Sequence, residues 1–383
     1  MLSLQSLSSF SKSLGFDLLS WIPYTQRDPQ HLELWLNEAR HACLDYMAEH
    51  PRHDPSILME HARSMILLTT SYNHPSSHAY SHLRIARYAH HLDYHEVLRE
   101  RLETLATFIA AETGAQLAWR CATDSAPLLE RTFAQHAGLG WIGKNSLLIH
   151  PSLGSFTLIA ELLLDIDPIT HTPPTPTPNR CGSCSKCLHA CPTQALASPY
   201  VLDARRCIST WTIESSGPIP RWIRPLIGDM IFGCDICQEV CPWNSKSHLS
   251  SDPKLLPSQH PTLSLSPLDI LTLTSRQFNQ IFAQSPVLRA GRHGLARNAA
   301  VVLGNSKNTS CIDTLLQRCS LEHSPLVRGH IAWALSQFDA SPSIIHTLQQ
   351  LMHNDPSSFV QLEAQLALEH LGHLAFSFDP MYP

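Results

Sequence analysis

Two cysteine-rich stretches, CGSCSKCLHACP at 181–192 and CDICQEVCP at 234–242, decide how the rest of this chain is interpreted. The first stretch spaces four cysteines as C-x2-C-x2-C-x3-C-P. The second repeats the last part of that spacing, C-x2-C-x3-C-P, and one further cysteine, Cys207, stands upstream of it. Of the 12 cysteines in the chain, eight therefore lie in this single region.

This spacing is typical of bacterial proteins with two [4Fe–4S] clusters, in which the cysteine before proline ligates the other cluster. The predicted ligands are Cys181, Cys184, Cys187 and Cys241 for the first cluster, and Cys191, Cys207, Cys234 and Cys237 for the second. Two zinc sites and a set of disulfides are the alternatives. Zinc sites do use C-x2-C pairs, but two runs that each end in Cys-Pro are not their usual spacing.

Length and composition place the protein in a reducing compartment. A chain of 383 residues is long enough for two or three domains with their own cores. The first 16 residues, MLSLQSLSSFSKSLGF, have no basic residue before Lys12 and predict an amphipathic helix, not a secretory signal. No stretch approaches the run of about 18 apolar residues that a membrane span requires. We therefore expect a cytoplasmic protein with reduced thiols, which also argues against disulfides.

The region before the cysteines predicts an α/β (α+β) domain over residues 1–170. Helical patterns alternate with short stretches of β-forming residues, at 30–50 and 95–113 for the helices and at 65–70, 146–150 and 156–164 for the strands. Such alternation indicates helices packed on one sheet. A proline-rich connector at 168–178 then leads into a ferredoxin-like insert at 179–250.

The last region, 265–375, predicts an all-α domain of helical repeats. Alanine-rich segments at 296–304, 327–335 and 360–368 are similar, and their leucines recur every 32–33 residues. This period indicates stacked helical hairpins of the HEAT kind, and a plain helical bundle is the alternative. Repeats of this kind usually bind a macromolecule. The net charge of −5 gives no general attraction for nucleic acid, so the basic helix starts Arg297 and Arg328 are the candidate RNA contacts.

Two segments of the first region carry candidate site residues. In CATDSAPLLER, at 121–131, a strand-like approach ends at Asp124 and a helix is expected near Pro127. On local chemistry Asp124 is either a helix cap or a functional acid. In GLGWIGKN, at 138–145, three glycines permit the backbone to approach a bulky ligand. Neither a phosphate-binding P-loop nor a nicotinamide fingerprint is present.

Taken together, these blocks closely resemble the epoxyqueuosine reductases, which are cobalamin-dependent iron–sulfur enzymes of tRNA modification. The resemblance covers nearly the whole chain. It rests on RHDP at 52–55, ARYA at 86–89, DYH at 93–95, DSAP at 124–127, GLGWIGKN at 138–145, GSF at 154–156, CIS at 207–209 and GCDICQEVCPWN at 233–244. The last block is the most specific, because a generic ferredoxin has no reason to contain it.

The resemblance implies the chemistry of the site. Electrons pass through the two clusters to base-off cobalamin, cycling between cob(II)alamin and cob(I)alamin, and the epoxide oxygen of epoxyqueuosine in tRNA is removed to leave queuosine. Asp124 matches the proton donor of the family, and burial against the corrin is expected to favour its neutral form. The residues matching or near the cobalamin site are Arg52, Asp124, Lys144, Asn145, Leu148, Ile159 and Ser209.

The implied partners are tRNA carrying epoxyqueuosine and a low-potential electron donor such as ferredoxin or flavodoxin, and the protein is expected to be a monomer with no membrane contact. The main alternative is a ferredoxin-type carrier that reduces a corrinoid for another protein. A third possibility is a structural iron–sulfur protein that binds RNA and needs no further cofactor. An electron carrier would need neither an acid next to the cofactor nor a domain of helical repeats that binds RNA.

Overall fold

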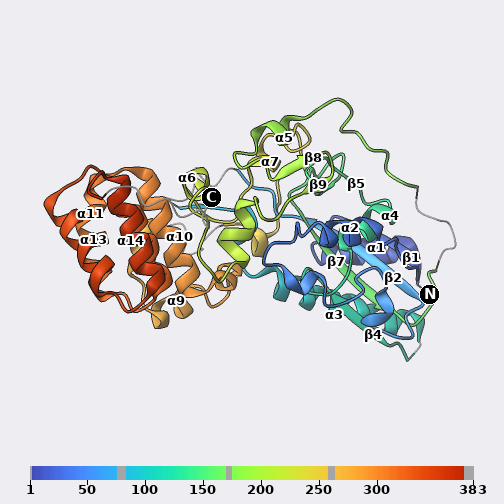
Figure 1. Cartoon of the computed structure of the whole chain (residues 1–383). Helices are drawn as coiled ribbons and strands as arrows, with labels where there is room; N and C mark the ends of the chain where they lie inside the picture. The colour runs from blue at the N-terminus through green and yellow to red at the C-terminus, as the bar shows by residue number, and fades with distance from the viewer. Residues whose placement is uncertain (1, 76–82, 115, 170–174, 258–263, 375–383) are drawn as a thin grey trace. The chain divides into compact units, whose positions relative to one another are not determined.

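The computed structural model describes residues 2–75, 83–114, 116–169, 175–257 and 264–374 (Figure 1). The chain folds into two compact units that each combine segments distant in sequence. The first comprises Met1–Ser76, Arg87–Cys207 and Asp235–His260, and the second comprises Ser77–Ala86, Ile208–Cys234 and Pro261–Pro383. The cysteine-rich region is therefore divided between the two units. The middle of the proline-rich connector, 170–174, lies outside the described residues.

A four-stranded antiparallel sheet forms the centre of the first unit, in the order β1-β2-β7-β4. Its strands are β1 (Leu18–Pro23), β2 (Ser64–Ser71), β7 (Thr157–Leu164) and β4 (Trp119–Ala122). All eight residues of β2 are buried, because both faces of this central strand are covered. The structure confirms the strands expected at 65–70 and 156–164, whose continuous apolar sequences suit burial on both faces.

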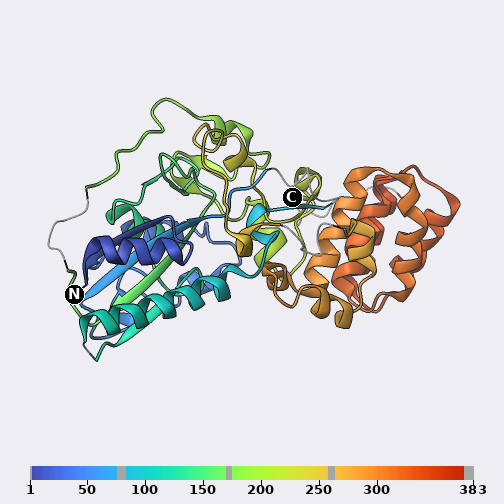
Figure 2. The ribbon, with the colours of Figure 1, turned by 180° about the vertical axis from the view of Figure 1, so that it is seen from behind.

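Helices α1 (Leu4–Ser13) and α3 (Tyr94–Thr113) cover one face of this sheet, as Figure 2 shows. Leu158 and Leu162 of β7 point to this face and share a core cluster with Leu98 of α3. The side chains of a strand alternate between the two faces, so every second residue of β7 contributes to this core. The expected helix at 95–113 is confirmed as α3.

The opposite face of the sheet packs against α4 (Glu130–His136), whose Phe133 is fully buried in a second core cluster. The helix expected at 30–50 is shorter than predicted. The observed α2 (Gln30–Asn37) ends before Ala39 and Ala42, which have φ values of 51° and 55°. Left-handed residues of this kind cannot continue a right-handed helix.

The cysteine-rich part of the first unit and the segments around it form short elements. These are α5 (Lys186–Ala190), α7 (Ile236–Glu239) and the strand pairs β5 (Trp141–Ile142) with β6 (Leu148–Ile149) and β8 (Leu196–Ser198) with β9 (Val201–Leu202). Helix α5 carries Cys187, α7 carries Cys237, and the two helices pack together. Short elements are usual where metal ligands and not a large apolar core hold the chain.

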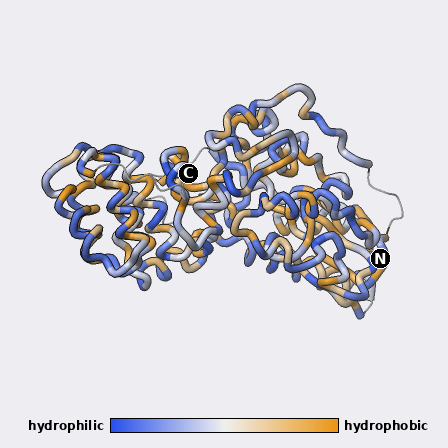
Figure 3. The backbone as a smooth tube through the Cα atoms, viewed as in Figure 1, coloured by the Kyte–Doolittle hydropathy of each residue, from blue (hydrophilic) through white to orange (hydrophobic). Residues whose placement is uncertain are grey.

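The second unit is mainly helical. Its elements are β3 (Arg84–Ile85), α6 (Arg224–Ile227), β10 (Met230–Phe232), α8 (Pro267–Thr272), α9 (Ser275–Ile281), α10 (Gly291–Ser306), α11 (Ile312–Leu321), α12 (Pro325–Leu335), α13 (Pro342–Asn354) and α14 (Ser358–His370). The three similar segments lie on α10, α12 and α14, which pack in succession. Both hydrophobic and hydrophilic residues occur in this helical region (Figure 3). Gly304 permits the close packing, because a Cβ there would lie 2.9 Å from the Cα of Ala334.

Arginine–carboxylate pairs connect successive repeats. Arg292 of α10 pairs with Glu322, which precedes α12, at 2.6 Å, and Arg328 of α12 pairs with Asp355, which precedes α14, at 2.7 Å. Burial works to raise the pKa of Glu322, but Arg292 and Arg318 hold it down at about 2. Glu322 is therefore charged at neutral pH. Each of the two pairs ties the start of a helix to the preceding repeat.

The prediction that Arg297 and Arg328 contact RNA is not supported by the structure. Arg297 is fully buried and donates hydrogen bonds to the carbonyl oxygens of Trp211, Ser215 and Gly217 at 2.6–2.8 Å. Arg328 is 9% exposed and is committed to Asp355. The sequence shows basic residues on two helices, but packing directs both side chains inward, where no phosphate can reach them.

Replacing Arg297 by methionine is expected to lower the free energy of unfolding by about 3 kcal/mol, because buried carbonyl groups lose their donors. Urea denaturation followed by circular dichroism measures this. The matched control is Arg276→Met on α9, where the side chain is exposed and the expected change is below about 0.5 kcal/mol. Equal stability of the two variants would contradict the structural role of Arg297.

Within the described part of the chain, no helix combines the length and the apolar character that crossing a membrane requires. The longest α-helix described, α3, has 20 residues and includes several charged side chains, Glu100 and Glu103 among them.

Candidate functional site

Asp124 lies in a short connection between β4 and α4. Strand β4 ends at Ala122, the Thr123 hydroxyl donates to the carbonyl oxygen of Ile159 at 2.9 Å, and Asp124 then adopts a φ of 48°. A left-handed non-glycine residue beside a sheet is a common feature of functional sites. Helix α4 begins at Glu130 with Leu129 at its cap position. The interpretation of Asp124 as a helix cap is therefore wrong, because the helix starts six residues later.

Tyr94 and His95, at the start of α3, both reach the Asp124 carboxylate. The Tyr94 hydroxyl donates to Oδ2 of Asp124 at 2.8 Å, and Nε2 of His95 lies 3.2 Å from the same oxygen. Nδ1 of His95 lies 2.7 Å from Oδ1 of Asp93. The imidazole is thus held between two carboxylates. Asp93 also caps α3 by accepting the backbone N–H of His95, which fixes the position of the ring.

These contacts determine where the proton resides. Burial lowers the pKa of His95, but the hydrogen bonds with Asp124 and Asp93 outweigh it and raise the pKa to about 9. Desolvation by the packed groups around the carboxyl raises the pKa of Asp124, but the hydrogen bonds from His95 and Tyr94 lower it below its ordinary value. At neutral pH the pair is therefore a protonated imidazole beside a carboxylate. His95 carries the proton in this contact, and the neutral form of Asp124 expected from burial against a corrin stays a prediction.

Asp124 remains accessible although its neighbours are packed. Its side chain is 61% exposed, whereas Arg52 is 7% exposed. The Arg52 guanidinium donates to the carbonyl oxygens of Tyr46 and Ala126, at 3.0 and 3.4 Å, and its backbone oxygen accepts the N–H of Leu129. Arg52 therefore holds the segment that follows Asp124 in place through hydrogen bonds to Ala126 and Leu129. The Asp124 carboxylate stays accessible to a ligand.

The structure brings several other predicted residues to this region. Leu148 and Ile159 join Ala122 and Leu128, which flank Asp124, in one apolar cluster. Asn145 lies in the turn before β6 and is 5% exposed, and its Nδ2 has no hydrogen-bond partner among the described residues. Ser209 belongs to the second unit, so it is not part of this group in the first unit.

Two acidic residues near Asp124, Glu161 and Glu130, were not singled out by any sequence motif. Glu161 is fully buried on β7, its Cα pairs with those of Leu67 and Ala122, and neither of its carboxyl oxygens has a partner in the described residues. Burial, then Glu130 and Asp124, raise its pKa well above the ordinary value. Burial and the Asp124 charge raise the pKa of Glu130 to about 8. Both glutamic acids are therefore protonated at neutral pH.

This arrangement predicts that stability falls as the pH rises. Below the unfolded pKa of 4.5 both states of Glu130 are protonated and no difference arises. Between that value and about 8 the unfolded chain releases a proton that the folded chain retains, which favours unfolding. Glu130→Gln and Glu161→Gln should therefore raise the melting temperature at pH 8 much more than at pH 5.5. A pH-independent effect in calorimetry would contradict the assignment.

The four cysteines assigned to the first cluster lie close enough for their charges to influence one another. Burial raises the pKa of Cys241, and Cys181, Cys187 and Cys184 raise it further. The pairing of Cys241 with the earlier run is the crossed arrangement expected from the spacing. Of the second set, Cys191, Cys207 and Cys237 belong to the first unit, and Cys234 ends a segment of the second.

Lys144 was predicted to contact the cofactor, but the structure directs its ammonium group elsewhere. Its Nζ donates to the carbonyl oxygens of Gly182 and Cys184, at 2.7 and 2.8 Å. Lys144 therefore binds the loop that carries the first two cysteines of the first set.

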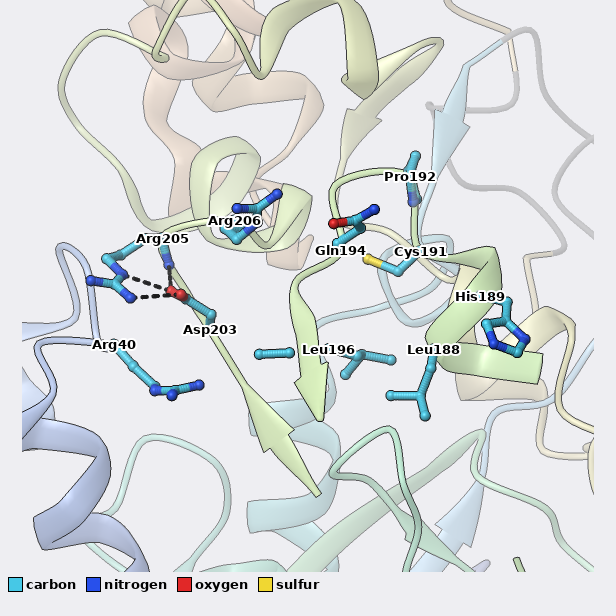
Figure 4. Close-up of a pocket in the computed structure, with 11 residues that line it drawn as sticks. Arg40, Leu188, His189, Cys191, Pro192, Gln194, Leu196, Asp203, Arg205 and Arg206 are labelled. Carbon is cyan, nitrogen blue, oxygen red and sulfur yellow. Dashed lines mark hydrogen bonds and ion pairs between the residues drawn. The ribbon is translucent and has the colours of Figure 1, made fainter. Parts of the chain in front are cut away.

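A pocket of about 800 Å³ lies beside Cys191 (Figure 4). Its lining includes Arg40, Arg205, Arg206 and Asp203. The Arg205 guanidinium faces Asp203 and donates two hydrogen bonds to it, at 2.7 and 2.8 Å. Arg206 donates to the carbonyl oxygen of Thr193 at 2.7 Å. With three arginines and a single carboxylate, the lining is basic on a chain whose net charge is negative.

Three family models match the chain. One described as epoxyqueuosine reductase QueG, DUF1730 matches residues 52–125, which contain Arg52, Tyr94, His95 and Asp124. A 4Fe-4S double cluster binding domain matches residues 180–244, and HEAT repeats match residues 287–369. The chain thus carries a double-cluster domain, and the repeat interpretation of the last region is confirmed.

Similar proteins cover most of the chain. An epoxyqueuosine reductase of Pseudomonas aeruginosa is 38% identical over 86% of this chain and 93% of its own length, and one of Escherichia coli K12 is 37% identical over 87% and 89%. A crystal structure of an epoxyqueuosine reductase, 29% identical, covers 96% of this chain and 98% of its own with a TM-score of 0.86. Another, with an epoxyqueuosine-modified tRNA-Tyr stem loop, gives 0.85 at the same identity and coverage. The chain belongs to the epoxyqueuosine reductase family of oxidoreductases.

Proposed function

We propose that this protein reduces epoxyqueuosine to queuosine in tRNA. The observation that carries the proposal is the accessible Asp124 carboxylate, held by Tyr94 and His95 within a fold that superposes on epoxyqueuosine reductases. A related structure contains a tRNA stem loop with this modified base, which supports tRNA as the substrate. Conversion of the epoxide to an alkene and water consumes two electrons and two protons, so the site needs both an electron source and an acid.

The two cysteine sets are the proposed ligands of two [4Fe–4S] clusters. The double-cluster match over residues 180–244 supports this, as does the clustering of Cys181, Cys184, Cys187 and Cys241. Cys191 accepts a hydrogen bond from the backbone N–H of Ala195 at 3.2 Å. A sulfur that already accepts an amide hydrogen bond is suited to the charged thiolate of a cluster ligand.

The Asp124 region is the proposed cobalamin site, with the cofactor in its base-off form. Buried donors without partners among the described residues support the fit: Nε of Arg52, Nε1 of Trp141 and Nδ2 of Asn145. A corrinoid carries many amide oxygens and a phosphate that can accept such donors. Leu148 and Ile159 contribute apolar surface. When bound, cobalamin supplies the low-potential nucleophile that the reaction requires.

Asp124 is the proposed proton donor, with His95 as its source. The imidazole holds a proton at Nε2, 3.2 Å from Oδ2 of Asp124, because its pKa is raised to about 9. Transfer from Nε2 to Oδ2 and then to the departing oxygen delivers one of the two protons that the reaction consumes, and solvent water supplies the second. The Tyr94 hydroxyl keeps the carboxylate oriented throughout, since burial and the adjacent charge raise the pKa of Tyr94 and keep it protonated. The site therefore operates through a hydrogen-bonded pair and not through a lone carboxylic acid.

The proposed electron donor is a low-potential ferredoxin or flavodoxin. The basic pocket beside Cys191 supports an acidic partner, because opposite charges steer association and orient the encounter. We propose a monomer in the cytoplasm. The alternative function, a carrier that reduces a corrinoid for another protein, shares the clusters but has no use for the Asp124–His95 pair.

The decisive experiment is turnover on modified tRNA. Protein reconstituted anaerobically with iron, sulfide and cobalamin is given a low-potential reductant and tRNA containing epoxyqueuosine, and the nucleosides are analysed by mass spectrometry. The expected product is lighter by one oxygen atom and is absent when cobalamin is omitted. Reduction of bound cobalamin without any change in the nucleoside would instead support the electron carrier.

A further inference from the structure

Lys144 connects the hairpin of β5 and β6 to the loop at 181–184, which carries the first two cysteines. It lies in the turn between β5 and β6, and its ammonium donates to the carbonyl oxygens of Gly182 and Cys184 at 2.7 and 2.8 Å. Both acceptors lie within the CGSC segment at 181–184. Two charge-assisted hydrogen bonds to one four-residue loop restrict its position, because such bonds are stronger than neutral ones.

The turn that presents Lys144 is itself well anchored. Trp141 is fully buried and packs edge-on against Trp243, which follows Cys241 and Pro242, with ring centres 5.0 Å apart. The Lys144 carbonyl oxygen accepts the backbone N–H of Tyr200 at 3.1 Å. The hairpin therefore contacts both parts of the chain that supply the first cysteine set, the loop at 181–184 and the residues after Cys241.

A second residue, Asn179, also forms hydrogen bonds that position the same loop. Asn179 accepts the backbone N–H of Cys181 at 3.0 Å, and its Nδ2 donates to the Tyr200 hydroxyl at 3.1 Å. The loop is thus positioned from the neutral Asn179 on one side and from the cationic Lys144 on the other. Of these two residues only Lys144 is charged. Mutation of Lys144 can therefore separate its effect on the position of the loop from the effect of its charge.

A fixed positive charge at this position has a predictable electrostatic consequence. Reduction of a [4Fe–4S] cluster adds one negative charge, which a nearby cation stabilises more than it stabilises the oxidised state. Net charge and hydrogen bonding around the thiolates are among the factors that set cluster potentials. An ammonium bound to the backbone of a ligand residue is less screened than one extended into solvent.

We propose that Lys144 positions the Cys181–Cys184 loop and, through its charge, raises the reduction potential of the cluster bound there. The inference rests on the proposed assignment of Cys181, Cys184, Cys187 and Cys241 to one cluster. In this role Lys144 is a positioning residue that acts on electron transfer through the first cluster.

The test is an anaerobic redox titration of reconstituted protein, followed by the electron paramagnetic resonance of the reduced clusters. Lys144→Met should make one of the two reduction steps about tenfold less favourable, which is a shift of about 59 mV to more negative potential for a one-electron couple. Lys144→Arg keeps the charge and should titrate like the wild type. Lys186→Met is the matched control, because Lys186 precedes Cys187 but is exposed, and no comparable shift is expected.

An unchanged potential in Lys144→Met at full iron content would overturn the proposal. If that variant loses iron, Lys144→Gln replaces it in the titration, because its amide can still donate to a carbonyl but carries no charge. For Lys144→Gln, a reduction potential about 59 mV more negative supports the proposal, and an unchanged potential overturns it. Failure of the cluster assignment is recognised separately, because it would reduce the iron content of the wild-type protein itself or leave Cys187→Ala with all of its iron.

Discussion

Asp124→Asn is expected to reduce turnover by roughly 10²–10⁴-fold, the usual contribution of general acid catalysis. Asparagine retains the shape of the side chain but cannot deliver a proton to the departing oxygen. It also tolerates the left-handed backbone at this position, where φ is 48°, so the fold should be preserved. Single-turnover rates on modified tRNA, measured with excess reductant, report the effect on the chemical step.

The control for this variant is its cofactor content. Iron, sulfide and bound cobalamin should match the wild type, because Asp124 lies outside both cysteine sets and the backbone contacts of Thr123 and Arg52 remain. Loss of the helix cap cannot explain a loss of activity, since Leu129 occupies the cap position of α4. Turnover close to normal would therefore exclude Asp124 as the proton donor.

Cys187→Ala and Cys237→Ala should each remove one cluster, and both should abolish turnover. About eight irons per chain are expected in the wild type and about four in each variant, because each [4Fe–4S] cluster holds four. Turnover stops in both cases because electrons reach the cofactor only when both clusters are present. Iron and sulfide analysis after anaerobic reconstitution gives the counts, and the two variants should lose different spectroscopic signals.

The matched control for the cysteine variants is Cys43→Ala. Cys43 is exposed and belongs to neither set, so its iron content and activity should equal those of the wild type. Zinc at two per chain in place of iron would contradict the cluster assignment. A full iron content in Cys187→Ala would contradict the grouping of Cys187 with Cys181, Cys184 and Cys241.

Features with a short sequence period could be predicted well. Strands β2 and β7 and helix α3 occur where continuous apolar or helical patterns indicated them. The repeated segments on α10, α12 and α14 were recognisable because each buries a similar alanine-rich face. Where local backbone geometry overrode the pattern, prediction failed: α2 ends early because Ala39 and Ala42 are left-handed, and α4 starts after Pro127.

The site was predicted in part. Asp124 could be identified from its motif, whereas the sequence did not reveal that Tyr94 and His95 converge on the same oxygen. These residues are about 30 positions apart in the chain, and only the packing of α3 across the sheet brings them together. The raised pKa of His95 follows from that contact, which no sequence motif records.

By itself the sequence determined which residues can ligate metal and which segments repeat, because ligand spacing and helical periodicity are local properties of the chain. Tertiary structure decided where each charge lies. It buried Arg297 against backbone carbonyls, left Glu161 inside the sheet without a partner among the described residues, and directed Lys144 to the cysteine loop. The physical reason is that burial and electrostatic partners depend on segments far apart in sequence, which no local pattern records.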